Sequence, residues 1–127
     1  EEGIELGPNI QAAGLDAARA SLGLVNRLQL DDLPRSRGFW MLGAHLLTAD
    51  HHTEALEAFA YAVQLAVRAD AEADAKLAMA FGALTELAAG RDGADERLAH
   101  ALDDLGSVEQ GADFVAQVTT ARRVLGL

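Results

Sequence analysis

The side chains best suited to chemistry are histidines, and three of them lie close together in the sequence. His51 and His52 are adjacent, His45 precedes them by about two helical turns, and Asp50 would complete a set of metal-ligand types. Adjacent residues on a helix do not share a face, however. We therefore expect His51 and His52 to lie in a hydrated turn, and the sequence predicts no metal site.

Carboxylates are abundant, but no pair of them has a spacing that identifies an active site. General acid–base catalysis needs two carboxylates fixed across a cleft with different pKa values. The acidic clusters instead fall at expected helix ends, at Asp31-Asp32, Asp70 to Asp74 and Asp103-Asp104. The loop from Gly90 to Gly93 lacks the Lys-Ser/Thr of a phosphate-binding loop, and the chain has no cysteine. No enzymatic activity and no cofactor are therefore expected.

Charge limits the partners that the chain can attract. Ten basic residues stand against 20 acidic ones, for a net charge of -10, so nucleic acid and anionic membranes should be repelled. No apolar run approaches the ~20 residues needed to cross a bilayer. A chain without cysteine fits the cytoplasm, which is the expected compartment because no signal peptide opens the sequence, and a start without Met indicates a piece of a longer protein. We expect a protein or peptide partner that is basic or amphipathic, and a homodimer stays open.

The elements that must position these residues are expected to be helices throughout. Alanine is abundant, proline is rare and β-branched runs are missing, which argues against strands. Pro34 predicts a break from Asp31 to Pro34, and Ser107 with Gln110 resembles a capping box that opens the last helix. The expected helices cover residues 8–30, 36–49, 71–89, 94–105 and 107–125, and a further helix that is capped by Asp50 or Thr53 and runs to about Arg68.

An internal repeat is the strongest signal in the sequence. When the chain is shifted by 39 residues, Leu42-Gly43-Ala44 falls on Phe81-Gly82-Ala83, and Phe59 falls on Leu98. Small residues are needed where two helices cross closely, and a large residue fills the wider gap one turn away. We therefore predict that Gly43 and Gly82 both mark close helix crossings. A hairpin of this kind buries its apolar side by stacking on a copy of itself.

The first unit, residues 36–69, resembles a tetratricopeptide repeat (TPR). Its first helix has Phe39, Leu42, Gly43 and Leu46 where that family places its aromatic, Leu, Gly and large apolar residues, and its second helix matches at Ala55, Phe59 and Ala62. The second unit, residues 75–105, matches more weakly, and the 39-residue offset is similar to the longer-period variant. The resemblance implies a single all-α domain over residues 1–127, with antiparallel hairpins stacked as a right-handed superhelix. An unrelated alanine-rich helical bundle is the alternative.

The resemblance also implies a function. In TPR arrays the first helix of each hairpin lines a concave groove that binds peptides or neighbouring domains, and long-period arrays are common in bacterial signalling and transcription regulators. It would place eight residues in the partner-binding groove: Arg37, Trp40, Met41, Ala44, Leu47, Lys76, Met79 and Ala83. Trp40 has an alternative place in the core. A scaffold that self-associates through Val115, Val118, Val124 and Leu125 is a second possible function, and an enzyme or a small-molecule sensor is a third.

Overall fold

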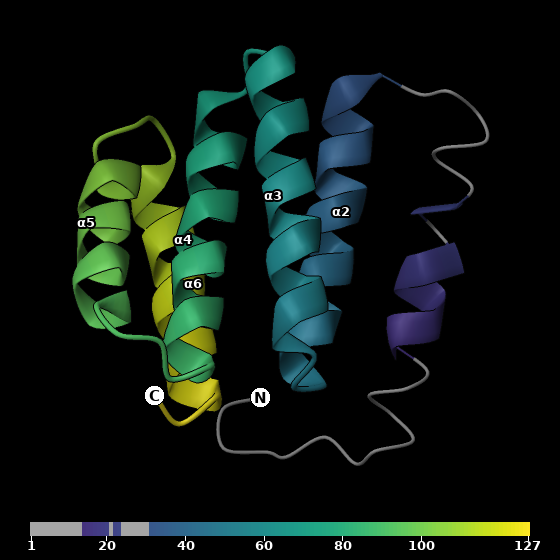
Figure 1. The fold of residues 1–127 in the computed structure, drawn as a ribbon. Helices are drawn as coiled ribbons and strands as arrows, with labels where there is room; N and C mark the ends of the chain where they lie inside the picture. The colour runs from purple at the N-terminus through teal and green to yellow at the C-terminus, as the bar shows by residue number, and fades with distance from the viewer. Residues whose placement is uncertain (1–13, 21, 24–30) are drawn as a thin grey trace.

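The protein is all-α in every part of the chain that the structure describes. The computed structural model describes residues 14–20, 22, 23 and 31–127, and all regular structure among them is helical, which confirms the predicted fold class. The rest of the predicted helix 8–30 lies outside the described residues. Figure 1 shows the principal helices, which are α2 (Asp32–Thr48), α3 (His52–Arg68), α4 (Glu72–Ala88), α5 (Ala94–Gly106) and α6 (Gly111–Val124).

The helical residues before α2 run alongside it. Leu22 lies 3.1 Å from the place where a Cβ on Gly38 would stand, and Gly14 lies against His45 at the other end of α2. These two contacts make the segment antiparallel to α2. Arg19 reaches α3, where its guanidinium lies 3.3 Å from the Glu54 carboxylate.

Helix α2 begins earlier than the sequence suggested. The predicted break from Asp31 to Pro34 is wrong, because α2 starts at Asp32 and Pro34 lies in its first turn. The first backbone N–H groups of a helix have no partner within it, so the N–H that proline lacks is not missed there. A proline near a helix start is therefore compatible with the helix that follows.

Three connections use the same tight turn. Asp50, Asp70 and Gly90 each have a positive φ, at 63°, 54° and 72°. In each case the next residue donates its backbone N–H to a carbonyl five residues earlier, as from His51 to Leu46 at 2.9 Å. This is the hydrogen bond of the Schellman motif, which ends a helix and reverses the chain. The repeated turn is why α2, α3, α4 and α5 are successively antiparallel (Figure 1).

The predicted capping box at Ser107 and Gln110 is wrong. The Ser107 hydroxyl donates to the backbone carbonyl of Asp104 at 2.6 Å, so it closes α5 and does not open the next helix. Gln110 adopts a left-handed φ of 65°, and α6 starts at Gly111. A Cβ on Gly111 would collide with the backbone carbonyl oxygen of Leu105. Only glycine therefore allows this close approach of the two chain segments.

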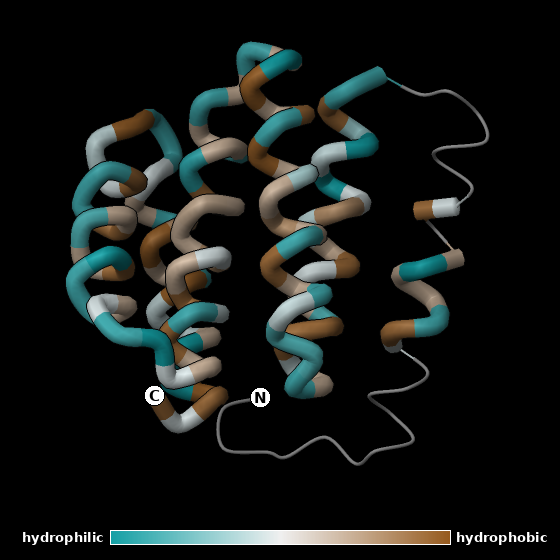
Figure 2. Tube along the Cα trace, in the orientation of Figure 1, coloured by the Kyte–Doolittle hydropathy of each residue, from teal (hydrophilic) through white to brown (hydrophobic). Residues whose placement is uncertain are grey.

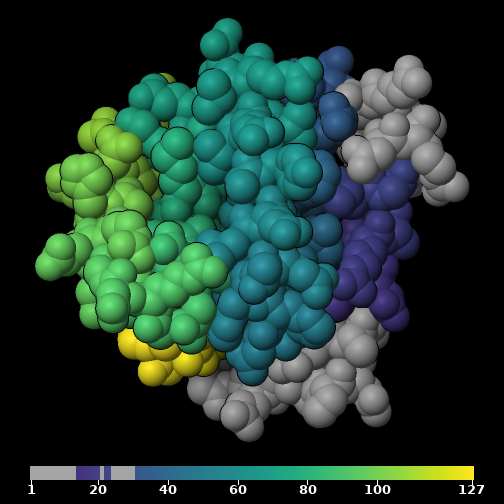
Figure 3. Space-filling view, in the orientation of Figure 1, coloured from purple at the N-terminus to yellow at the C-terminus, as the bar shows by residue number. Residues whose placement is uncertain are grey.

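Helix α4 lies at the centre of the domain. It packs against α2, α3, α5 and α6, whereas α3 and α5 do not pack against each other. Figure 3 shows the face on which α3, α4 and α5 follow one another from teal to green. Because α4 has neighbours all around, its buried residues include Leu77, Phe81 and Leu84. Figure 2 shows hydrophilic residues gathered at the turns and along the outward side of α5.

The core is built from a few large side chains among many alanines. Phe59, Leu84, Leu98, Leu105 and Val118 are almost fully buried, and the rings of Phe59 and Phe81 lie 5.7 Å apart. Burial of Val118 removes it from the predicted self-association patch, since a side chain without exposed surface cannot contact a second copy.

The two repeat glycines have different surroundings. A Cβ on Gly43 would lie 2.7 Å from the Phe59 ring, as expected for a close crossing, whereas a Cβ on Gly82 would meet nothing within 4 Å. The prediction for Gly82 is therefore wrong. Leu98, which corresponds to Phe59 in the repeat, is a smaller, fully buried residue that does not come within 4 Å of a Cβ on Gly82, and Gly82 lines an open groove.

Candidate functional site

Two grooves flank α4, one between α2 and α6 and the other between α3 and α5. The α2–α6 groove contains Trp40 and lies over Leu77 and Phe81 of α4. The α3–α5 groove lies over Met79 and Gly82 of α4. Successive residues of a helix are rotated by about 100°, so Leu77 and Phe81 lie on the side of α4 that is opposite to Met79 and Gly82.

Trp40 divides the α2–α6 groove into two hollows. It projects from α2 and meets Phe81 of α4 edge to face, with ring centroids 5.3 Å apart and planes at 89°. One hollow has a volume of about 410 Å³ and the other about 490 Å³, and α6 forms the far wall of both. Phe114 of α6 lines that wall, and Met41 of α2, which is 46% exposed, lies at the rim.

The indole of Trp40 is half-buried and has one unsatisfied group. Its Nε1 is buried and donates to no acceptor within the described residues. A buried N–H without an acceptor costs about 1–3 kcal/mol relative to a paired one. The ring also packs against the core. Trp40 thus belongs to the groove wall and to the edge of the core at once, and it packs on the following hairpin through Phe81.

Polar groups border both hollows of this groove. The Arg37 guanidinium lies 3.1 Å from the Asp74 carboxylate, which joins α2 to α4. Gln117 of α6 borders both hollows. The remaining lining is mostly apolar, so the groove combines an apolar floor with a polar rim, as binding sites for protein segments commonly do.

The structure divides the predicted site residues between two faces. Four of them line the α2–α6 groove, namely Arg37, Trp40, Met41 and Ala44. Leu47 is only 3% exposed and belongs to the core. The other three line the opposite face, namely Lys76, Met79 and Ala83.

The predicted pocket that combined Trp40 with Met79 and Lys76 is therefore wrong. The repeat offset carries Trp40 onto Met79, but the α4 residue that contacts Trp40 is Phe81. Two residues along a helix correspond to a rotation of about 200°. The first helices of the two units thus turn different sides toward the groove, which spacing in the sequence does not reveal.

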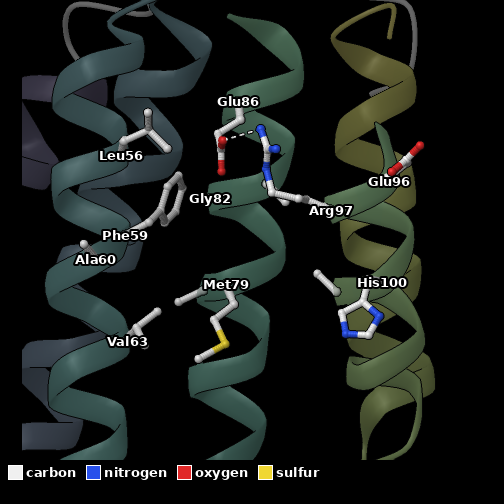
Figure 4. A pocket seen from close by; sticks show the side chains of 13 residues that line it. Leu56, Phe59, Ala60, Val63, Met79, Gly82, Glu86, Glu96, Arg97 and His100 are labelled. Atoms are coloured by element: carbon white, nitrogen blue, oxygen red, sulfur yellow. Dashed lines mark hydrogen bonds and ion pairs between the residues drawn. The ribbon is translucent and has the colours of Figure 1, made fainter. Parts of the chain in front are cut away.

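The α3–α5 groove was not predicted from the sequence. Figure 4 shows Gly82 at its floor, Leu56, Phe59, Ala60 and Val63 on one wall, and residues of α5 on the other. The main hollow has a volume of about 540 Å³, and a second hollow of about 430 Å³ continues it past Met79. The signal that could have revealed it is the change from Phe59 to Leu98 between the repeat units.

Ion pairs border this second groove. Arg97 of α5 lies 2.7 Å from Glu86 of α4 (Figure 4). Lys76 lies 3.0 Å from Glu72 and 3.2 Å from Asp104. The hydrogen bonds from Lys76 to Glu72, and then to Asp104, raise the pKa of the Lys76 ammonium above its ordinary value.

Replacing Lys76 with glutamine is expected to lower the thermal midpoint slightly at neutral pH. Because folding raises the pKa of Lys76, its ion pairs stabilise the folded state fully at pH values below the ordinary pKa of 10.5. This stabilisation is lost as the pH rises through the higher pKa of the folded state. The difference in melting temperature between the wild type and Lys76→Gln should therefore be constant from neutral pH to about pH 9.5 and narrow only between about pH 10 and about pH 12. A difference that stays constant over this last range would contradict the assigned ion pairs.

The histidines do not come together. The His51 Nδ1 lies 3.3 Å from Glu54, and the His52 Nε2 lies 3.7 Å from Asp50. In residues 14–20, 22, 23 and 31–127, no group of three or more His, Asp or Glu side chains could hold a metal ion. Within the same residues, no helix combines the length and the apolar character needed to cross a membrane.

Comparisons with known proteins leave this geometry as the basis for a functional proposal. The chain matches no protein-family model, no curated protein and no solved structure.

Proposed function

We propose that the domain is a non-catalytic, TPR-like interaction module that binds a peptide segment of another protein in the α2–α6 groove. The observation that carries this proposal is the position of Trp40 between two apolar hollows. Tryptophan is the residue most enriched among interface hot spots, and it contributes most when it lies at the centre of a contact. A segment with apolar side chains on both sides of Trp40 would fill both hollows.

The packing supports a TPR-like arrangement. Helices α2, α4 and α6 pack in a row, with α4 in contact with both neighbours, whereas α3 and α5 do not touch. A stack whose helices lie closer on one side is curved toward that side, as in a superhelix of hairpins. The α2–α6 groove would then be the concave face. By the same resemblance, the natural context would be a bacterial signalling or transcription regulator.

The chemistry of the groove favours a peptide over a small polar ligand. Two of its polar groups, Arg37 and Asp74, are already paired with each other, and most of the lining is apolar. Met41 offers a flexible, polarizable surface that can adapt to different side chains.

Self-association is the second candidate, because the C-terminal end exposes apolar side chains. Val124 is 48% exposed and Leu127 is 41% exposed. A net charge of -10 opposes the approach of two copies at low ionic strength. Light scattering over a concentration series separates the two candidates, since a monomer that captures peptides contradicts self-association as the main role.

Trp40 provides the direct test, because it is the only tryptophan in the chain. We expect peptides selected from a displayed random library to shift the emission of Trp40 on binding. Ala116, an exposed residue of α6, lines one hollow beside Trp40. Ala116→Glu should therefore weaken capture about tenfold or more, because it places a charge in an apolar contact.

A matched control is available on the same helix. Ala112 is also exposed, but it borders a different surface, between α5 and α6. Ala112→Glu should leave capture unchanged. A library that yields no binder, or binders that leave Trp40 emission unchanged and tolerate Ala116→Glu, would refute the proposal.

A further inference from the structure

We propose that the α3–α5 groove is a second interaction surface and that its occupant is a basic amphipathic helix of about three turns. This surface lies on the side of α4 away from Trp40, so it does not depend on the function proposed for the α2–α6 groove.

The length of the groove follows from the residues of α3 that line it. They recur at helical spacing along one stripe, as Leu56, Phe59, Ala60, Val63 and Val67. From the first to the last of these residues, the stripe extends for about 16 Å along the helix axis. About three turns of a bound helix have the same length, and its apolar stripe could contact the whole wall.

The shape of the α3–α5 groove favours a helix as its occupant. Helices α3 and α5 both pack on α4 but not on each other, which leaves a channel above α4 between two helical walls. The floor and sides contain small residues, among them Ala60, Ala78 and Gly82. Small residues let a second helix approach closely, with its ridges in the grooves of its neighbours. Met79, 46% exposed, would lie under the occupant and adapt to its side chains.

The charges that line the α3–α5 groove favour a basic occupant. The lining contains five carboxylates, from Asp70, Glu72, Glu86, Glu96 and Asp104, against the two cations Lys76 and Arg97. Both cations already form ion pairs within the domain. Lysine or arginine on the flanks of a bound helix would meet this acidic excess, which steers association and excludes acidic competitors. A second copy of the chain, with a net charge of -10, lacks that complementarity.

The probe that tests this proposal is a synthetic peptide of about 14 residues made of leucine, alanine and lysine, with leucines on one helical face. Its control has glutamate in place of every lysine. The chain has two methionines, with Met79 in this groove and Met41 in the other. Methyl-labelled methionine therefore gives one NMR signal for each groove. We expect the basic peptide to shift the Met79 signal saturably and to leave the Met41 signal in place, whereas the acidic peptide shifts neither.

Variants at Ala60 test the role of charge without disturbing the core. Ala60 is exposed on α3 and borders the groove. Ala60→Lys should weaken binding of the basic peptide about tenfold, and Ala60→Glu should bind it at least as well as the wild type. Gly82→Leu fills the open floor and should weaken binding by a similar factor, with the helical circular dichroism signal retained.

Three outcomes would overturn the proposal. The basic peptide could bind with equal affinity to the wild type, Ala60→Lys and Gly82→Leu, or the acidic peptide could bind as well as the basic one. The Met79 signal could also change with protein concentration alone, which would identify a second copy as the occupant. None of these results bears on peptide binding in the α2–α6 groove, because that proposal is tested by the signals of Trp40 and Met41.

Discussion

Phe59→Ala is expected to lower the free energy of unfolding by about 3–5 kcal/mol, which is the usual cost of removing a buried phenylalanine. The Phe59 side chain is 1% exposed, packs 5.7 Å from the Phe81 ring and lies directly against Gly43. Its removal therefore leaves a cavity between α2, α3 and α4. Urea denaturation followed by circular dichroism measures the change.

Val67→Ala is the matched control for Phe59→Ala. Val67 lies on the same helix but is 58% exposed. A substitution at such an exposed position should change the unfolding free energy by no more than about 0.5 kcal/mol. A loss below about 1 kcal/mol for Phe59→Ala would show that the side chain does not hold the three helices together.

The second large effect is expected at Gly43, where leucine should destabilise the fold by about 3 kcal/mol. A Cβ there already lies 2.7 Å to 2.9 Å from three carbons of the Phe59 ring, so leucine must push apart α2 and α3. Gly82→Leu adds a side chain in open space and replaces a poor helix former with a good one. We expect it to be neutral or to stabilise the domain by up to about 1 kcal/mol.

A double variant isolates the contact between Gly43 and Phe59. If leucine at position 43 collides with the Phe59 ring, Phe59→Ala should make room for it. The double variant should then be more stable than the sum of the two single changes predicts, by about 0.5–3 kcal/mol. Strict additivity of the two changes, or equal costs for Gly43→Leu and Gly82→Leu, would contradict the close crossing.

Much of the fold was predictable from the sequence because helix signals are local. The all-α class follows from composition, and the predicted helix 94–105 agrees within one residue with α5 because Gly90 and Gly93 both adopt positive φ before it. The start of α2 was wrong because a proline is compatible with a first turn as well as with a break. A local pattern cannot distinguish these two roles of Pro34.

The candidate site was less predictable because it depends on rotation and on neighbours. Four of the predicted residues do line one groove, but the repeat offset placed Met79 beside Trp40 on the wrong side of α4. Gly82 has the same residue type and repeat position as Gly43, and yet it meets open space. Whether a glycine marks a close crossing depends on the side chain that faces it, and only the packed structure determines that side chain.

The central claim is that Trp40 marks a groove that binds peptide segments and is separate from the groove around Gly82. The most direct measurement is a titration of the methyl-labelled protein with a library-selected peptide that changes Trp40 emission. The signals of Met41 and Met79 report on the two grooves separately. We predict a saturable shift of the Met41 signal together with an unchanged Met79 signal. A shift of Met79 alone, or equal shifts of both signals, would contradict the claim.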